Sequence, residues 1–295
     1  MRRFYIAVIL FMLPVFVFMG GAEYVVRQIP NDYKYKNDWL EHHAEEVKTL
    51  VLGSSHALDG INPDFLGKNA FNLAFPSQTL KYDHYLFFRW AHRFKTLKMV
   101  IFPISYFSFF FSDMEQIRET YYSIYMDYPA PSIDLEMLCY GPYTAKIGHY
   151  KEGRAIECQK NGWACRSLSD KDMANWNKDY ITASLIRKQT ADSWKWIDSN
   201  YSYLSEMASY CKNHGIRFVM VALPHTKRYN QHLDKKQLGK TLSLTSSLKQ
   251  QYSLDFFDYR EDCRFVDDDF IDQSHLSDVG AEKFTKILMN DLQHK

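Results

Sequence analysis

Two serines follow a glycine at the end of a hydrophobic segment early in the chain. The sequence reads KTLVLGSSHALDGI over residues 48–61, and the two hydroxyls belong to Ser54 and Ser55. A glycine followed by serines after a strand most often forms a turn or a helix cap. The same position would also present a serine nucleophile at the edge of a sheet, provided that the rest of the chain supplies a base.

A matching pair of residues stands near the C-terminus. The segment FIDQSHLSDVGAEKF places Asp272 and His275 three residues apart, just before a helix whose start is marked by Ser277. On such a turn the carboxylate accepts a hydrogen bond from the imidazole, which fixes the tautomer and leaves the other nitrogen free to take a proton. By itself, an Asp-x-x-His spacing is more often a capping or surface pair. Together with Ser55, it indicates a catalytic Ser-His-Asp set.

The elements that position these residues alternate between strands and helices. Apolar segments predict strands, and apolar residues at helical spacing predict helices. The expected strands are 49–55, 69–75, 97–105, 216–224 and 254–259, and the expected helices are 80–94, 194–215 and 276–292. Continuous apolar strands indicate a parallel sheet covered on both faces, with its carboxyl ends along one edge where ligands bind. We therefore expect Ser55 and His275 to meet at this edge.

Residues 112–195 break the alternation. They are rich in Tyr, Trp, Asp and Lys, which predicts a largely helical insertion within one α/β domain. The tryptophans in or beside this insertion would suit stacking on sugar rings, although aromatic side chains more often fill cores. They are Trp176, Trp194 and Trp196.

The N-terminus predicts export. Arg2 and Arg3 precede about nineteen uncharged residues, enough to cross a bilayer, and the arginines would hold their start on the cytoplasmic side. We expect residues 1–22 to form an uncleaved transmembrane anchor, with a cleaved signal peptide as the alternative. Residues 23–47 would be a connector to the α/β domain, 48–295, which would lie in the periplasm or at the cell surface, or be secreted after cleavage.

Composition and spacing argue against several partners. The chain has 36 basic and 35 acidic residues without a long basic stretch, so no nucleic acid is expected. It has no glycine-rich phosphate loop, and we expect no nucleotide or other cofactor. His42 and His43 have no metal-ligand spacing with cysteines or acidic pairs, so no metal is expected. Export would permit a disulfide, for which Cys158 and Cys165 are the expected pair.

The blocks VLGSSHALDGI and DQSHLSDVGA together resemble the SGNH (GDSL-like) hydrolase superfamily, especially its membrane-anchored members associated with surface glycans. The family's nucleophile falls on Ser55, with Ser54 in place of the usual aspartate. Its last block, Asp-x-x-His, falls on Asp272 and His275. The resemblance implies a flavodoxin-like three-layer sandwich with a parallel sheet.

The resemblance also implies an oxyanion hole beside the nucleophile. The family builds it from the serine N–H, a glycine N–H in the second block and an asparagine amide in the third. In this chain Ser77 stands at the glycine's place, where its backbone N–H still serves, and the third block, VIFPISYFSF, has no asparagine. One missing donor typically costs about 10²–10³ in rate. The residues expected to line the oxyanion site or contact substrate are Ser77, Gln78, Ser105, Asn72 and His225.

Residues and resemblance together predict an extracytoplasmic serine acyl-ester enzyme acting on acylated carbohydrate. Ser55 would attack the acyl carbonyl, His275 would carry the proton and Asp272 would orient His275. Hydrolysis and O-acyl transfer to a glycan remain open, and transfer would need a membrane-bound acyl-donor partner. The alternative is a non-catalytic glycan-binding or assembly component that retains the fold. The missing asparagine favours this alternative, and the intact Ser-His-Asp set opposes it.

Overall fold

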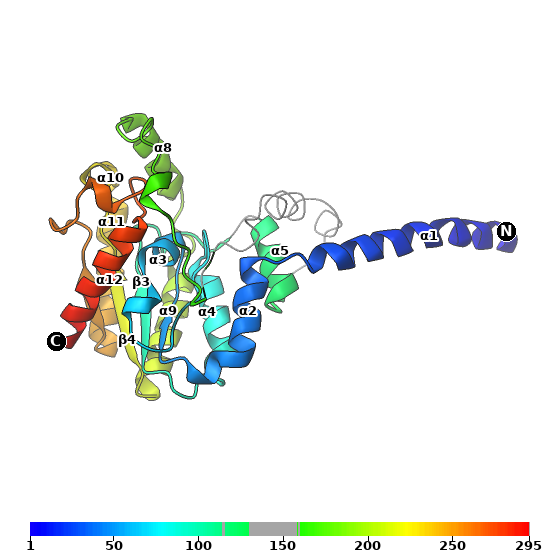
Figure 1. The fold of residues 1–295 in the computed structure, drawn as a ribbon, viewed down its shortest axis with the longest axis horizontal. Coiled ribbons are helices and arrows are strands. Elements are labelled where there is room, and N and C mark those ends of the chain that lie inside the picture. The colour runs from blue at the N-terminus through cyan, green and yellow to red at the C-terminus, as the bar shows by residue number, and fades with distance from the viewer. Residues whose placement is uncertain (114–115, 130–157, 159, 295) are drawn as a thin grey trace. The chain divides into compact units, whose positions relative to one another are not determined.

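The computed structural model describes residues 1–113, 116–129, 158 and 160–294 (Figure 1). The chain divides into two compact units. The smaller comprises Met1–Asn37 and Glu115–Glu157, and the larger comprises Asp38–Met114 and Cys158–Lys295.

A five-stranded parallel sheet forms the centre of the larger unit. Its strands are β1 (Thr49–Val51), β2 (Ala70–Asn72), β3 (Met99–Pro103), β4 (Arg217–Ala222) and β5 (Asp255–Asp258). Their order is β2-β1-β3-β4-β5, and every neighbouring pair is parallel. This is the flavodoxin-like order of doubly wound sheets. The predicted α/β class with a parallel sheet is confirmed.

Two groups of helices cover the sheet, giving the expected three layers (Figure 1). On one face α3 (Ser55–Gly60) packs against α12 (Asp278–Gln293). On the other face α9 (Ile197–Asn213) contacts both α4 (Leu80–Ala91) and α11 (Lys235–Tyr252). Helices α4, α9 and α12 begin and end within about one turn of their predicted bounds.

Shorter elements connect these layers or precede them. They are α2 (Asp32–His43), η1 (Ala44–Glu46), η2 (Pro63–Phe65), η3 (Leu168–Asp170), α8 (Asp179–Gln189), α10 (Lys227–His232) and η4 (Asp267–Asp269). The strands are also shorter than predicted. The segment after Val51 turns at once into α3, because Gly53 has left the extended conformation, with a φ of 115°.

The hydrophobic core contains residues from the segment predicted to be an insertion. Trp163 and Trp176 are buried in the same cluster as Val51 of β1, Val219 of β4 and Phe284 of α12. The core interpretation therefore holds for Trp176, whose ring is almost entirely covered.

The predicted insertion, 112–195, is also divided between the two units. Helix α5 (Gln116–Tyr125) belongs to the smaller unit, and the residues from Cys158 onward belong to the larger one. The part from 130 to 157 lies outside the described residues.

The expected disulfide between Cys158 and Cys165 is not formed, and the Cys165 thiol is free. Cys158 pairs with Ala164 across an isolated antiparallel bridge. Successive side chains of an extended segment point to opposite sides, so Cys165 faces away from the Cys158 side chain. Accordingly, Cys158 is buried and Cys165 is exposed.

The smaller unit contains α1 (Arg2–Arg27), whose stretch Arg2–Val25 is long and apolar enough to cross a membrane. The helix extends beyond the predicted end at residue 22. Glu23 and Arg27 form an ion pair at 2.7 Å with i,i+4 spacing, which stabilises this last turn. Within the same unit, Tyr33 stacks on Tyr121 of α5, with ring centroids 5.0 Å apart.

The positive residues before the apolar helix predict an orientation that reporter fusions measure. A reporter that works only outside the cytoplasm should be active at the C-terminus of the full chain, because Arg2 and Arg3 hold the helix start inside. The same fusion without residues 1–27 is the control and should be inactive. Activity of a strictly cytoplasmic reporter on the full chain would show the opposite topology.

Candidate active site

Ser55 lies where the sheet order makes a ligand site most accessible. The chain passes from β1 outward to β2 and then returns to β3 on the other side of β1, so the carboxyl ends of β1 and β3 flank the topological switch point. Ser54 occupies the N-cap position of α3 without a capping hydrogen bond from its side chain, and Ser55 is the first residue of the helix. Ser54 is buried, whereas Ser55 is partly exposed. The second serine is therefore the one that a substrate can reach.

A buried carboxylate fixes the turn before the serines. Asp83 of α4 accepts the backbone N–H of Gly53 at 2.7 Å and the side-chain amide of Gln78. Gly53 holds a φ of 115°, and a Cβ there would lie 3.2 Å from the Cβ of Ala57 and 3.3 Å from Cδ of Pro103. Only glycine fits this approach without strain. Burial raises the pKa of Asp83 to about 7, although the hydrogen bonds from Gln78 and Gly53 act to lower it.

The second half of the site is a tight turn closed by backbone pairing. Phe270 and Leu276 form an antiparallel bridge, and the N–H of Ile271 donates to the carbonyl of His275 at 3.1 Å. Inside the turn, Oδ1 of Asp272 accepts the backbone N–H groups of both Ser274 and His275, each at 2.9 Å. Such local bonds are typical of aspartate in turns. They hold the carboxylate beside its own histidine.

Helix α12 begins immediately after this turn. Ser277 is its N-cap, and its Oγ accepts the N–H of Gly280 at 3.2 Å. This confirms the helix start predicted at Ser277. The cap fixes where the turn that contains His275 ends.

The two chain ends meet in a continuous chain of hydrogen bonds. Ser55 Oγ lies 2.9 Å from Nε2 of His275 and donates to it. The opposite ring nitrogen, Nδ1, donates to Asp272 at 2.9 Å from Oδ1 and 2.8 Å from Oδ2. All three residues are partly exposed, while their neighbours His56, Gln273 and Ser274 are buried. The geometry is that of a nucleophile, a general base and an orienting carboxylate.

The charges around His275 favour its protonated form. Burial alone would lower the pKa of His275, but the charge of Asp272 and its hydrogen bond raise it above the usual value of 6.5. Burial would raise the pKa of Asp272, but the charge and hydrogen bond of His275 hold it below its ordinary range. Arg166, 3.9 Å from Asp272, acts in the same direction. Asp272 therefore stays ionised while His275 takes and releases a proton.

Two further histidines pack beside the base. His56 makes edge-on contacts with His275 and His225, at centroid separations of 4.9 and 5.1 Å. Burial, followed by the charge of His275, lowers the pKa of both, that of His225 to about 3 and that of His56 well below 6.5. Both are neutral at physiological pH, so His275 is the only one of these three rings positioned to cycle its charge. Nδ1 of His225 is buried without a hydrogen-bond partner.

The residues that were expected to line the oxyanion site lie in different environments. Ser77 is exposed, with a φ of 58° in the left-handed region that favours glycine, so it adopts the backbone of the glycine that the family resemblance places there. The backbone N–H of Phe75 donates to the carbonyl of Gly53 at 3.3 Å, which joins this loop to the nucleophile turn. Gln78, in contrast, uses its amide to donate to Asp83.

The other expected lining residues have internal partners. Asn72 is fully buried, and its amide donates to the carbonyls of Ala57 at 2.9 Å and Ile61 at 3.1 Å. Its predicted contact with substrate is therefore corrected: it ties the end of β2 to α3. Ser105 is buried, and its Oγ lies 2.9 Å from Nδ1 of His56. The Ser105 hydroxyl, one candidate substitute for the missing asparagine of the third block, is therefore hydrogen-bonded to the His56 imidazole.

Sequence reasoning missed a second carboxylate near the base. Asp59 of α3 is 4% exposed and forms an ion pair with Arg166 at 3.1 Å. Arg166 also faces Asp272, so one guanidinium links the two acidic residues. The sequence offered one signal, an aspartate four positions after Ser55 on the same helix. Its ion-pair partner, Arg166, lies in the segment predicted to be an insertion, so the sequence did not connect the two residues.

Across the described ranges, no group of three or more His, Cys, Asp and Glu side chains is arranged to hold a metal ion. The arrangement at Ser55 supplies a nucleophile and a base from protein groups. Such an arrangement can carry out acyl transfer through a serine.

Comparison with solved structures finds distant similarity. A GDSL-like lipase from Bacteroides thetaiotaomicron VPI-5482 is 11% identical, with 90% of this chain and 99% of that chain covered and a TM-score of 0.43. A lipase/acylhydrolase from Enterococcus faecalis is 8% identical, with 84% and 96% covered and a TM-score of 0.40. No protein-family model and no curated protein matches the sequence.

The Asp83 network predicts a contrast between two substitutions. Asp83→Asn keeps an oxygen that accepts from Gly53 and Gln78, whereas Asp83→Leu leaves both donors buried without a partner. Each such donor costs about 1–3 kcal/mol, so Asp83→Leu should lower the free energy of unfolding much more than Asp83→Asn. Urea denaturation of both variants measures this. Equal losses would show that the two hydrogen bonds contribute nothing.

The same comparison has a pH signature. The folded-state pKa of Asp83, about 7, lies above its ordinary value of 3.8, so folding takes up a proton between these values. Its contribution to stability is therefore largest at low pH and is lost as pH rises towards 7. Asp83→Asn should remove this dependence.

Proposed function

We propose that this protein is a serine acyl-ester enzyme of the SGNH type that acts on acylated carbohydrate. The observation that carries the proposal is the continuous hydrogen-bond chain from Ser55 through His275 to Asp272. Its members come from opposite ends of the sequence and meet at the switch point of the sheet, where doubly wound folds place their ligands. A capping or surface pair would not require this meeting.

The first step forms an acyl-enzyme. His275 Nε2 takes the proton of Ser55 as the serine oxygen bonds to the acyl carbonyl carbon. The carbonyl oxygen becomes an oxyanion, for which the backbone N–H groups of Ser55 and Ser77 are the proposed donors. In hydrolysis the bond between the acyl carbon and the sugar oxygen then breaks, and the sugar oxygen leaves with the proton held by His275. In transfer the bond that breaks joins the acyl group to its donor, and the leaving atom of the donor takes this proton. Asp272 keeps the imidazole in the required tautomer throughout.

The acceptor of the second step decides the overall reaction. Water would release the free acid, and a glycan hydroxyl would receive the acyl group, with His275 again taking the proton from either. The acyl-enzyme is common to both outcomes. Transfer would also require a membrane-bound partner to supply the acyl donor, consistent with the apolar helix α1.

A non-catalytic glycan-binding or assembly role is the second candidate. It is favoured by the third block, which has no asparagine and whose Ser105 hydroxyl is hydrogen-bonded to His56. The intact hydrogen bonds of Ser55 and His275 oppose it. The loss of one oxyanion donor is consistent with a slower enzyme, by about 10²–10³, rather than with the absence of catalysis.

The proposed location is outside the cytoplasm, with α1 as a membrane anchor. The support is the length and apolar character of Arg2–Val25 and the two arginines at its start. Surface glycans would then be accessible to the larger unit.

Substituting Ser54 and Ser55 one at a time tests which of the two neighbouring serines is the nucleophile. Ser55→Ala should abolish hydrolysis of a short acyl ester and labelling by a serine-directed fluorophosphonate, because it removes the attacking oxygen. Ser54→Ala is the matched control. The Ser54→Ala variant should retain both ester hydrolysis and labelling, since Ser54 is buried and lies outside the hydrogen-bond chain of Ser55, His275 and Asp272. Activity in Ser55→Ala with loss only in Ser54→Ala would refute the assignment.

The pH dependence tests the base. His275 accepts a proton only when neutral, so kcat/KM should fall as pH drops through its pKa, and the midpoint should lie above 6.5 because Asp272 raises that pKa. Asp272→Asn should move the midpoint to lower pH and reduce kcat by up to about 10⁴. His275→Ala should approach the loss seen in Ser55→Ala.

These variants also separate an enzyme from a scaffold. Equal turnover in wild type, His275→Ala and Asp272→Asn on one verified ester would leave only the binding role. A glycan-binding assay on the same variants should show retained binding in either case, which confirms that they fold.

A further inference from the structure

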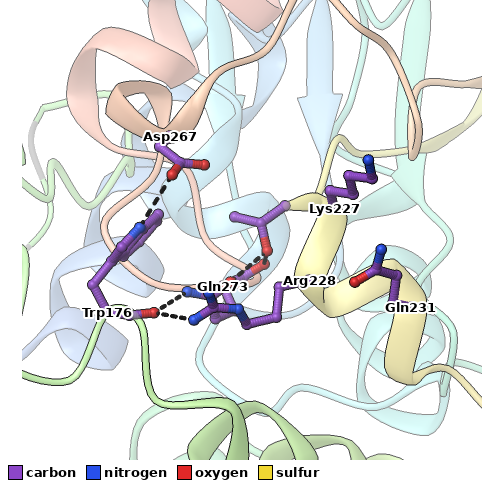
Figure 2. Close-up of a pocket in the computed structure, with 7 residues that line it drawn as sticks. Trp176, Lys227, Arg228, Gln231, Asp267 and Gln273 are labelled. Carbon is purple, nitrogen blue, oxygen red and sulfur yellow. Dashed lines mark hydrogen bonds between the residues drawn. The ribbon is translucent and has the colours of Figure 1, made fainter.

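A cavity lies at the start of α10. Its volume is about 220 Å³, and Figure 2 shows it between the start of α10 and the segments that carry Trp176, Asp267 and Gln273. Its lining is mostly polar or charged and is formed by Trp176, Thr226, Lys227, Arg228, Gln231, Asp267 and Gln273.

The cavity and the active site are built from the same two turns. Thr226 follows His225, and Gln273 lies between Asp272 and Ser274. The backbone N–H of Thr226 donates to the carbonyl of Gln273 at 3.2 Å, and its hydroxyl donates to Oε1 of Gln273 at 2.6 Å. One residue of each turn therefore faces the cavity, while an adjacent residue belongs to the cluster around His275.

Hydrogen bonds hold the cavity wall in place. The carbonyl of Trp176 accepts from Gln273 at 2.9 Å and from Arg228 at 2.8 Å, and its indole N–H donates to Asp267 at 3.2 Å (Figure 2). The Lys171 ammonium lies 3.6 Å from the centre of the indole ring. The tryptophan is thus fixed by four neighbours, so the wall is preformed and does not depend on a ligand for its order.

The charge of the cavity is not balanced by ion pairs. Arg228 donates only to neutral oxygens, the carbonyl of Trp176 and the side chain of Asn177, the latter at 3.4 Å. Lys227 is exposed at the rim and forms no ion pair within the described part of the chain. The one acidic lining residue, Asp267, accepts from the indole. The cavity lining therefore contains two cationic side chains and only one carboxylate.

Size and lining restrict the ligand. Pockets that enclose drug-sized molecules measure about 300–1,000 Å³, so this cavity accepts a single small group. Its polar and charged lining does not suit an acyl chain. The exposed amide of Gln231 and the ammonium of Lys227 remain available to a ligand, and Arg and Lys are the usual partners of carboxylate and phosphate groups.

We propose that this cavity binds an anionic group, a carboxylate or a phosphate ester, on the carbohydrate part of the substrate whose ester lies at Ser55. The proposal rests on the proposed function and gives its substrate class: an acidic glycan. The bound anion would lie against Lys227 and Arg228, with a neighbouring sugar positioned so that its acyl ester reaches the serine.

Binding measurements on the full-length protein in detergent test this without relying on catalysis. The background is Ser55→Ala, and the probes are glucuronate, glucose 6-phosphate, glucose and inorganic phosphate, titrated by calorimetry or by ligand-observed NMR. At least one of the two anionic sugars should bind more tightly than glucose and than inorganic phosphate. The affinity should fall as salt is added, because the contacts are charged. Whichever anionic sugar binds identifies the source of the charge.

A single substitution locates the site. Lys227→Gln removes one cation from the rim and should weaken binding of the anionic sugar by about tenfold. Lys235→Gln is the matched control, since Lys235 is also exposed and lies outside the cavity lining; it should leave the affinity unchanged. Binding of both glucuronate and glucose 6-phosphate no tighter than that of glucose, or equal affinity for the anionic sugar in Lys227→Gln and Lys235→Gln, would overturn the proposal.

The outcome is distinguishable from a failure of the proposed function. An anionic sugar that binds through Lys227 in a protein whose esterase activity survives Ser55→Ala would support the cavity and reject the serine mechanism. A protein that loses esterase activity in Ser55→Ala but binds neither glucuronate nor glucose 6-phosphate more tightly than glucose would support the mechanism and reject the cavity.

Discussion

The buried carboxylate of Asp83 is the interaction on which the geometry of the site depends. It accepts the N–H of Gly53 and the amide of Gln78, and so joins the end of β1 to the loop after β2. A buried carboxyl is costly without such partners, and its pKa of about 7 records the cost that remains. With the turn fixed in this way, Ser54 is buried just before α3 and Ser55 reaches solvent at the helix start.

The electrostatics of the site separate three histidines into two roles. His56 and His225 are buried, and both burial and the charge of His275 lower their pKa values and keep them neutral. His275 packs against His56, but Asp272 offsets the burial of His275 and raises its pKa. One carboxylate therefore makes His275 the ring that protonates most readily of the three. Arg166 lowers the pKa of that carboxylate and pairs with Asp59, which connects the triad to α3.

The segment that interrupts the α/β alternation contributes to both the site and the cavity. Trp163 donates to the carbonyl of Asp59 at 2.8 Å, Arg166 pairs with Asp59 and Asp272, and the carbonyl of Trp176 accepts from Gln273. These contacts place the segment along the turn that carries His275. The segment therefore contacts the proposed triad, and its Trp176 lines the cavity proposed to bind an acidic substrate.

The sequence by itself determined the sheet class, the apolar helix and the trio of Ser55, Asp272 and His275, because apolar periodicity and short motifs are local properties of the chain. Tertiary structure decided which hydroxyl is accessible, since Ser54 and Ser55 differ only in the direction set by Gly53 and Asp83. Long-range contacts also assigned Asn72 to α3, left the Cys165 thiol free and brought Arg166 to the triad. The physical reason is that a side chain's partners depend on elements distant in sequence, which spacing and composition do not specify.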